Sequence, residues 1–141
     1  MYYHKRKYTD SRIIIYVCII CAIVGYNGFM IYRSVHNSFT QTEVTARVVD
    51  AVTKQVGNEG RWFVYIQPVE KTEADTEYTD VGDPLVVEVS DTYLYGKFNS
   101  SDRFFELKQH IGTIYHFTLQ GERNAFWSTW QNIVEYTPVS Q

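Results

Sequence analysis

The chain has 141 residues, with 13 Lys and Arg against 16 Asp and Glu, and a formal net charge of −3. Residues 1–36 carry five basic residues and one acidic residue (5 − 1 = +4), whereas residues 37–141 carry eight and fifteen (8 − 15 = −7). A net charge of −7 repels phosphate, so nucleic-acid binding is not expected of the second part.

Residues 13–32 read IIIYVCIICAIVGYNGFMIY, twenty residues without a charge. A helix of that length spans roughly 30 Å, the thickness of the hydrocarbon layer, so we expect a transmembrane helix in a lipid bilayer. Residues 1–12 form a basic tail, which predicts a cytoplasmic N-terminus and an exported C-terminal domain. A cleavable signal peptide is the alternative, but the apolar run is long and no small-x-small site follows it, which favours an uncleaved signal anchor.

Small residues gather on one face of this expected helix. At about 100° per residue they share an arc of about 120°. Such a face lets membrane helices approach closely, which suggests a homo-oligomer or a partner helix, although small residues are also common in membrane helices generally. The two cysteines are interpreted as apolar helix residues and not as a metal or redox pair, since both lie within the hydrocarbon. The face consists of Cys18, Cys21, Ala22, Gly25 and Gly28.

After a linker at 33–42, residues 43–138 are expected to form one domain, followed by a tail at 139–141. Alternating apolar residues predict five strands, and the alternation slips at 49–52, which suggests a β-bulge in the first strand. Pro68 is expected to end the second strand or to mark an edge, and residues 71–84 to form an acidic surface loop. The expected strands are 43–56, 61–67, 85–91, 113–120 and 133–137.

A short helix is expected between the third and fourth strands. Residues 99–102 offer capping side chains at its start, and Gly112 is a natural residue just beyond its end. Phe104, Leu107, Lys108 and Ile111 share one face of it. The order of three strands, one helix and two strands is that of the OB-fold, a small Greek-key barrel, with a split barrel or a sandwich as alternatives.

No catalytic pattern stands out in residues 43–141. His110 and His116 have no cysteine partner and no HExxH spacing, and neither a GxSxG elbow nor a phosphate-binding glycine loop occurs. The sequence therefore predicts no enzyme activity, no cofactor and no metal site.

Aromatic residues form the candidate contact surface. Phe126, Trp127 and Trp130 lie in the connection before the last strand, and Tyr93 and Tyr95 follow the third strand. Exposed aromatic side chains are enriched at protein interfaces and also stack on sugars. We therefore expect another protein as the partner, with glycan or peptidoglycan as the alternative ligand.

Several short segments, taken together, resemble a family of small, single-pass membrane proteins of unknown function from bacteria and their phages. The resemblance implies a cell-envelope protein anchored in the bacterial inner membrane, with its C-terminal domain in the periplasm, and it implies no catalytic residues. It would fit a module that modulates the envelope, phage entry or lysis. The segments are GKFNSSD at 96–102, Gly112-x-x-Tyr115, Gly121-x-Arg123 and Phe126-x-Ser128-x-Trp130-x-Asn132-Ile133.

Overall fold

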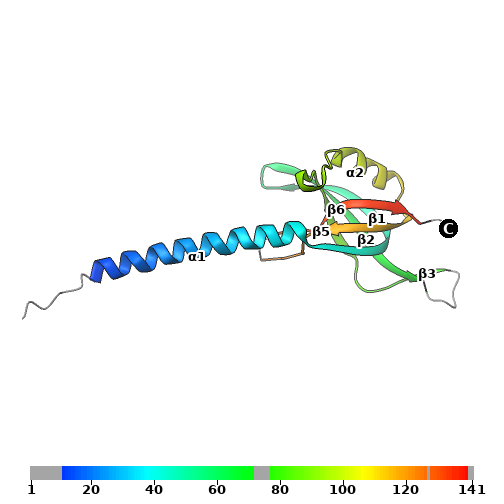
Figure 1. The fold of residues 1–141 in the computed structure, drawn as a ribbon. Helices are drawn as coiled ribbons and strands as arrows, with labels where there is room; N and C mark the ends of the chain where they lie inside the picture. Colours follow the sequence, from blue (N-terminus) through cyan, green and yellow to red (C-terminus); the bar gives the residue numbers. More distant parts are fainter. Residues whose placement is uncertain (1–10, 72–76, 127, 140–141) are drawn as a thin grey trace, which may run out of the picture. The chain divides into compact units, whose positions relative to one another are not determined.

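The computed structural model describes residues 11–71, 77–126 and 128–139. The expected basic tail therefore lies outside the described residues for all but its last two positions, as do Trp127 and the final two residues. The chain divides into two compact units, Met1–His36 and Asn37–Gln141. An N-terminal apolar helix is followed by a six-stranded sheet domain with a further helix (Figure 1).

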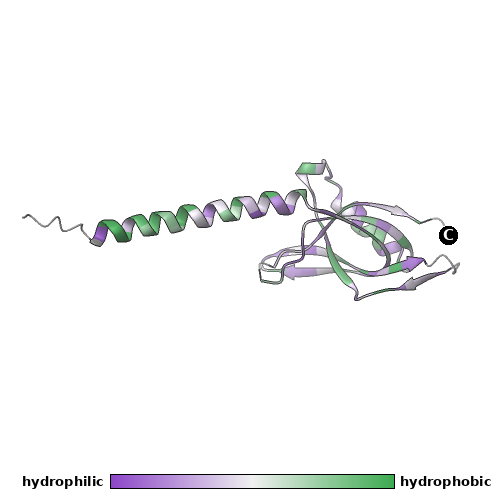
Figure 2. Cartoon of the chain, turned by 60° about the horizontal axis from the view of Figure 1, so that its bottom comes forward, coloured by the Kyte–Doolittle hydropathy of each residue, from purple (hydrophilic) through white to green (hydrophobic). Residues whose placement is uncertain are grey.

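Helix α1 (Ser11–Phe39) contains the uncharged stretch and continues through residues 33–39, which we expected to form part of a linker. It is long and apolar enough to cross a membrane by length and composition, and its large apolar side chains are exposed. Figure 2 shows the hydrophobic colouring along this helix. Asn27 donates its side-chain Nδ2 to the carbonyl of Ile23 at 2.7 Å. This bond satisfies a polar amide inside an apolar segment, where no water would be available to it.

Strand β1 (Gln41–Val56) is long enough to pair with two partner strands, and it is irregular in the middle. Its first part pairs with β5 (Ile114–Gln120) and its later part with β2 (Glu59–Lys71), both antiparallel. The register shifts between Val48 and Asp50, so the β-bulge expected at 49–52 is confirmed. The Asp50 carboxylate accepts the main-chain N–H of Ala51 at 2.7 Å, which satisfies a donor beside the shift.

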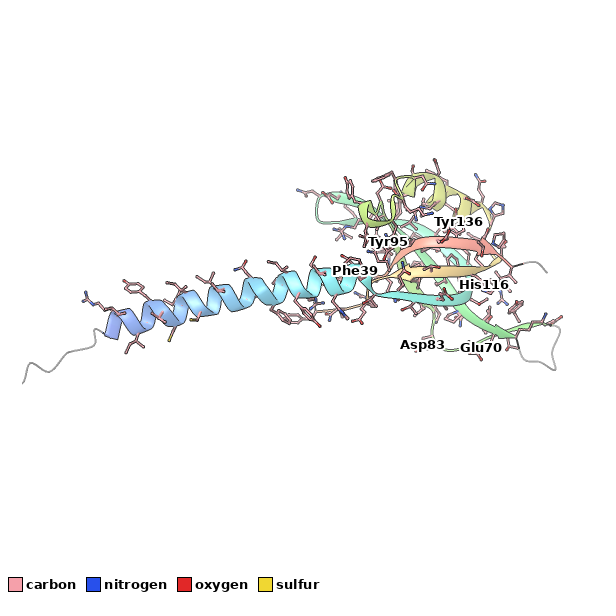
Figure 3. The ribbon with its side chains drawn as sticks, viewed as in Figure 1. Phe39, Glu70, Asp83, Tyr95, His116 and Tyr136 are labelled. Carbon is pink, nitrogen blue, oxygen red and sulfur yellow. The ribbon has the colours of Figure 1, made fainter. Side chains whose placement is uncertain are left out.

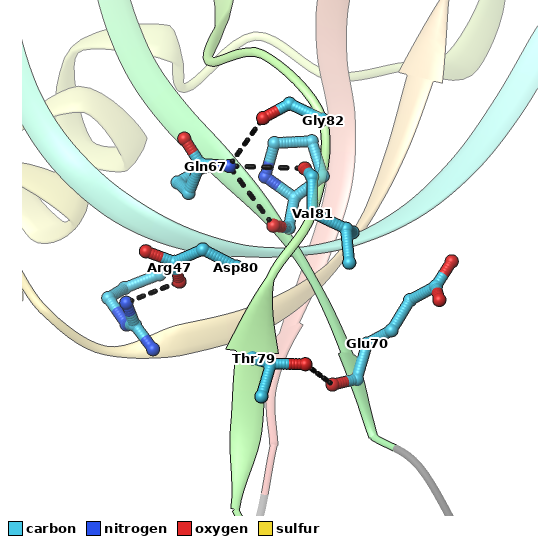
Figure 4. Close-up of polar contacts among 8 residues, drawn as sticks. Arg47, Gln67, Glu70, Thr79, Asp80, Val81 and Gly82 are labelled. Carbon is cyan, nitrogen blue, oxygen red and sulfur yellow. Dashed lines mark hydrogen bonds and ion pairs between the residues drawn. The ribbon is translucent and has the colours of Figure 1, made fainter.

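We expected Pro68 to end the second strand or to mark an edge, and strand β2 does not end there. It continues to Lys71, and there it pairs with β3 (Tyr78–Asp80), a short strand inside the segment expected to be a loop. Gln67 fixes the following turn by donating its side-chain amide to the carbonyls of Val81 and Gly82 at 3.1 and 3.2 Å (Figure 4). An ion pair of 2.6 Å between Arg47 on β1 and Asp80 on β3 joins these two strands.

The strand pairings return to their starting point. Strand β2 pairs with β4 (Leu85–Val89), β4 pairs in parallel with β6 (Asn132–Pro138), and β6 pairs with β5, which pairs with β1. The parallel contact is short, with a single register pair, Glu88 and Asn132, and the Asn132 side chain extends it through bonds of 2.8 and 3.2 Å with the main chain of Ser90.

Helix α2 (Ser100–Gln109) lies between β4 and β5 in the chain, as expected, and packs on the strands (Figure 1). The hydroxyl of Tyr136 on β6 donates to the carboxylate of Glu106 on α2 at 2.5 Å, and burial together with this bond raises the pKa of Tyr136. The core gathers apolar side chains from α2 and from all strands except β3: Ala46, Val48, Ala51, Val64, Ile66, Val87, Val89, Phe104, Leu107, Tyr115, Phe117, Leu119 and Ile133.

Candidate functional site

The connection between β5 and β6 forms a small hairpin. Asn124 and Thr129 exchange two main-chain hydrogen bonds of 3.1 Å, and Ser128 adopts a positive φ of 51°, which turns the chain at the tip. Phe126 lies in this tip, and its side chain is 84% exposed. The expected contact residue Phe126 is therefore presented to solvent, while Trp127 beside it lies outside the described residues.

Trp130, which was expected in the contact surface, contacts Phe63 and Arg123 of the same domain. Its ring packs edge-on against Phe63 of β2 at a centroid distance of 5.0 Å, and the Arg123 guanidinium lies 3.6 Å from the centre of the ring. Arg123 also donates to the carbonyl of Thr129 at 2.9 Å. The guanidinium, the indole and Phe63 form a stack that holds the base of the hairpin on β2.

A second exposed aromatic segment follows β4. The 3₁₀ helix η1 (Tyr93–Tyr95) is closed by two hydrogen bonds between Thr92 and Lys97, of 2.8 and 3.1 Å, and by Gly96 at a φ of 60°. Tyr93 is 88% exposed, whereas Tyr95 is half-buried and its hydroxyl donates to the carbonyl of Ser38 at 3.1 Å. Of the two tyrosines, Tyr93 is thus available for contact and Tyr95 is a support.

Both segments are tied to residues 37–40, where the chain enters the domain. The main chain of Glu122 donates to the Asn37 side chain at 2.7 Å, and that of Gly121 donates to the carbonyl of Thr40 at 2.8 Å. Tyr95 and Phe39 accordingly appear at the same end of the domain in Figure 3. The bases of both candidate contact segments are thus bonded to residues 37–40.

A cavity of about 340 Å³ lies beside the β2–β4 pair, lined by residues that include Arg61, Trp62, Glu88 and Asp91. Burial raises the pKa of Glu88, and the Arg61 guanidinium, 3.8 Å away, opposes this shift. Asp91 accepts the main-chain N–H of Ser100 at 3.0 Å, and hydrogen bonding to the Ser100 side chain, together with this main-chain bond, lowers the pKa of its carboxyl. Both carboxylates are thereby engaged by neighbouring groups, Asp91 as the acceptor that caps α2.

A second cavity of similar volume lies on the outer face of β1, β5 and β6, with Glu43, His116 and Glu135 among its lining residues. His116 faces outward, as expected, and its Nδ1 lies 2.8 Å from the Thr45 hydroxyl. Within the described ranges, no group of three or more His, Cys, Asp or Glu side chains is placed to hold a metal ion.

The residue that the sequence did not single out is Arg103 on α2. Its side chain is buried, with 5% exposed, and its guanidinium donates to the carbonyls of Ile133 at 2.6 Å and Ser90 at 3.0 Å. Burial lowers its pKa, while the charges of Tyr136 and Asp91 oppose this shift. Arg103 thus bonds to β6 and to the residue directly after β4, next to the short parallel pairing of these two strands. Its place beside Phe104 and one turn before Leu107 was the signal that it faces inward.

The small-residue face of α1 is also described. Cys18 and Cys21 are unpaired thiols on an exposed helix surface, as is Ala22. A Cβ atom added to Gly25 or Gly28 would meet nothing within 4 Å. Nothing within the described residues of this chain therefore requires glycine at either position.

No protein-family model, curated protein or solved structure matches this chain.

Proposed function

We propose that the protein is a membrane-anchored interaction module of the bacterial cell envelope. In this proposal α1 remains uncleaved and crosses the inner membrane once, with the N-terminus in the cytoplasm and the sheet domain in the periplasm. The charge difference between the two parts, +4 before residue 37 and −7 after it, supports this direction of insertion. The resemblance to small single-pass membrane proteins of bacteria and their phages is consistent with the same placement.

The sheet domain is proposed to be an OB-like barrel. Five strands that each have two hydrogen-bonded neighbours, in the ring β1–β5–β6–β4–β2, support closure of the sheet. The parallel pairing of β4 with β6 and the helix between β4 and β5 also agree with OB topology. Closure leaves β3 as the extension at one end and removes most exposed strand edges, which suits a domain that has no cysteine to cross-link it.

The proposed activity is binding of another envelope protein, and not catalysis. The observation that supports it best is Phe126, which is 84% exposed at the tip of a hairpin whose base is held by the Arg123–Trp130–Phe63 stack. A large apolar side chain on a fixed base loses little conformational entropy on binding, which is typical of an interface hot spot. The hairpin is bonded to Asn37, five residues beyond the uncharged stretch, so the partner is expected to be a membrane protein as well.

Photocross-linking tests this proposal. A benzoylphenylalanine is placed at Phe126 in the full-length protein, and a matched probe at Phe105, which is exposed on α2. We expect a discrete cross-linked protein from position 126 and none from position 105. Retention on purified murein sacculi that is lost in Phe126→Ala, without a protein cross-link, would instead support the glycan-binding alternative. Equal cross-linking from both positions would contradict a specific interface at the hairpin.

A further inference from the structure

The segment 92–98 exposes three large apolar side chains together. Tyr93 is 88% exposed, Leu94 48% and Phe98 59%, and the rings of Tyr93 and Phe98 pack edge-on at 5.4 Å. We refer to these three residues as the η1 knob. The hydrogen bonds between Thr92 and Lys97 close the segment, so the knob belongs to a formed structure. Contiguous apolar groups of this kind indicate a contact with something other than water.

The knob is tied to the chain directly beyond the apolar helix. The hydroxyl of Tyr95, within η1, donates to the carbonyl of Ser38, and the side chain of Gln120 donates to the same carbonyl at 2.9 Å. Ser38 follows Tyr32, the last residue of the uncharged stretch, by six residues of α1. Six helical residues rise about 9 Å, whereas the headgroup layer is roughly 5–8 Å deep on each side of a bilayer. Ser38 is therefore close to the outer edge of the headgroups if α1 spans the membrane.

The charge of the segment also suits a lipid surface. Residues 92–101 contain one basic residue, Lys97, and no acidic residue, although the domain around them has fifteen acids. Tyrosine and phenylalanine rings are favoured at the membrane–water interface, and a lysine ammonium is attracted to lipid phosphates. The tip of the β5–β6 hairpin differs from this segment, since it presents a single described aromatic side chain, Phe126, near the charged Glu122 and Arg123.

We propose that the η1 knob inserts into the headgroup layer of the membrane that α1 spans, as a second and shallow membrane contact of the domain. This inference rests on the proposed anchoring by α1. Two other exposed apolar side chains, Phe105 on α2 and Ile111 after it, are 53% and 52% exposed. The Phe105 ring packs edge-on against Phe104 of α2 at 5.5 Å, and both exposed side chains are expected to remain in water.

Quenching by brominated lipids tests the contact in the full-length protein. Cys18 and Cys21 are replaced by serine, and a single cysteine, either Leu94→Cys or the matched control Ile111→Cys, carries an environment-sensitive fluorophore. The proteins are reconstituted in vesicles of phosphatidylcholine and phosphatidylglycerol, which contain no partner protein. We expect at least twofold stronger quenching, and a blue-shifted emission, for the label at position 94.

A further variant separates the knob from the label. Tyr93→Ser together with Phe98→Ser, in the protein labelled at position 94, is expected to reduce quenching to the level of the control at position 111. Equal quenching at both labelled positions, or quenching that persists in the double variant, would overturn the proposal. An alkaline carbonate wash tests the anchoring by α1 separately from the knob contact. Protein that stays in the vesicles retains its anchor whatever the label reports, whereas protein that is washed out overturns the anchoring and the knob contact together.

Discussion

Replacing Arg103 by methionine is expected to destabilise the domain strongly. The guanidinium makes two hydrogen bonds of 3.0 Å or shorter to main-chain carbonyls, one on β6 and one on Ser90, directly after β4. Hydrogen bonds to charged groups contribute about 1.5–3 kcal/mol each, and the lower end applies because removing a buried charge also relieves its desolvation. Two such bonds give about 3 kcal/mol, a large share of the roughly 5–15 kcal/mol that stabilises a typical domain. The midpoint of thermal unfolding should fall by about 12 °C or more.

The measurement is denaturant unfolding of the full-length protein in detergent, followed by circular dichroism of the strands. Lys108→Met is the matched control, since Lys108 is an exposed cation on the same helix and its replacement should change the free energy of unfolding by less than about 0.5 kcal/mol. Arg103→Lys keeps the charge but loses the planar fork, so we expect a stability between those of the wild type and Arg103→Met. An Arg103→Met protein within about 1 kcal/mol of the wild type would refute the assigned role.

Gly121 has a φ of 84°, and a Cβ there would lie 2.9 Å from the Asn37 side chain, whereas Gly57 has a φ of 65° and open space. Gly121→Ala should therefore cost about 1 kcal/mol more unfolding free energy than Gly57→Ala, and equal costs would show that the Asn37 contact is unimportant. Burial raises the pKa of Glu88 above 4.5 in the folded protein, so ionisation of this carboxyl opposes folding as the pH rises through the folded pKa. Glu88→Gln, which cannot ionise, should therefore gain stability relative to the wild type between pH 4 and pH 7. A stability difference that does not change with pH would contradict this. Leucine at both Gly25 and Gly28 should abolish the cross-linked dimers expected of native membranes, and a wild type captured only as a monomer would remove the packing hypothesis.

The regular parts of the fold were predictable because their residues alternate. The alternation over 113–120 predicted a strand with one buried face, and Tyr115, Phe117 and Leu119 are buried while His116 faces outward. The helix between the third and fourth expected strands is also present as α2. Five of the six strands were expected, including the irregularity in β1.

The missed features depend on contacts between residues distant in the chain. Strand β3 has three residues, and what orders it is pairing with the extension of β2 beyond Pro68, which no local pattern reveals. Asn99 was expected to cap α2 but makes no side-chain bond there, and Asp91 accepts the N–H of Ser100 instead. The packing of Trp130 against Phe63 and Arg123 was also not predicted, because no local pattern shows which residues will meet a tryptophan in a loop.

The proposed function depends most directly on the direction in which α1 crosses the membrane. Two reporters are fused in turn to the C-terminus of the full-length chain in a bacterial host, alkaline phosphatase, which needs the periplasm to form its disulfides, and green fluorescent protein, which matures in the cytoplasm. We predict an active phosphatase fusion and a dark fluorescent fusion, both in the membrane fraction at the size of the uncut 16.5 kDa chain plus the reporter. A fluorescent C-terminus, or a shortened product in the soluble fraction, would contradict the proposed envelope module.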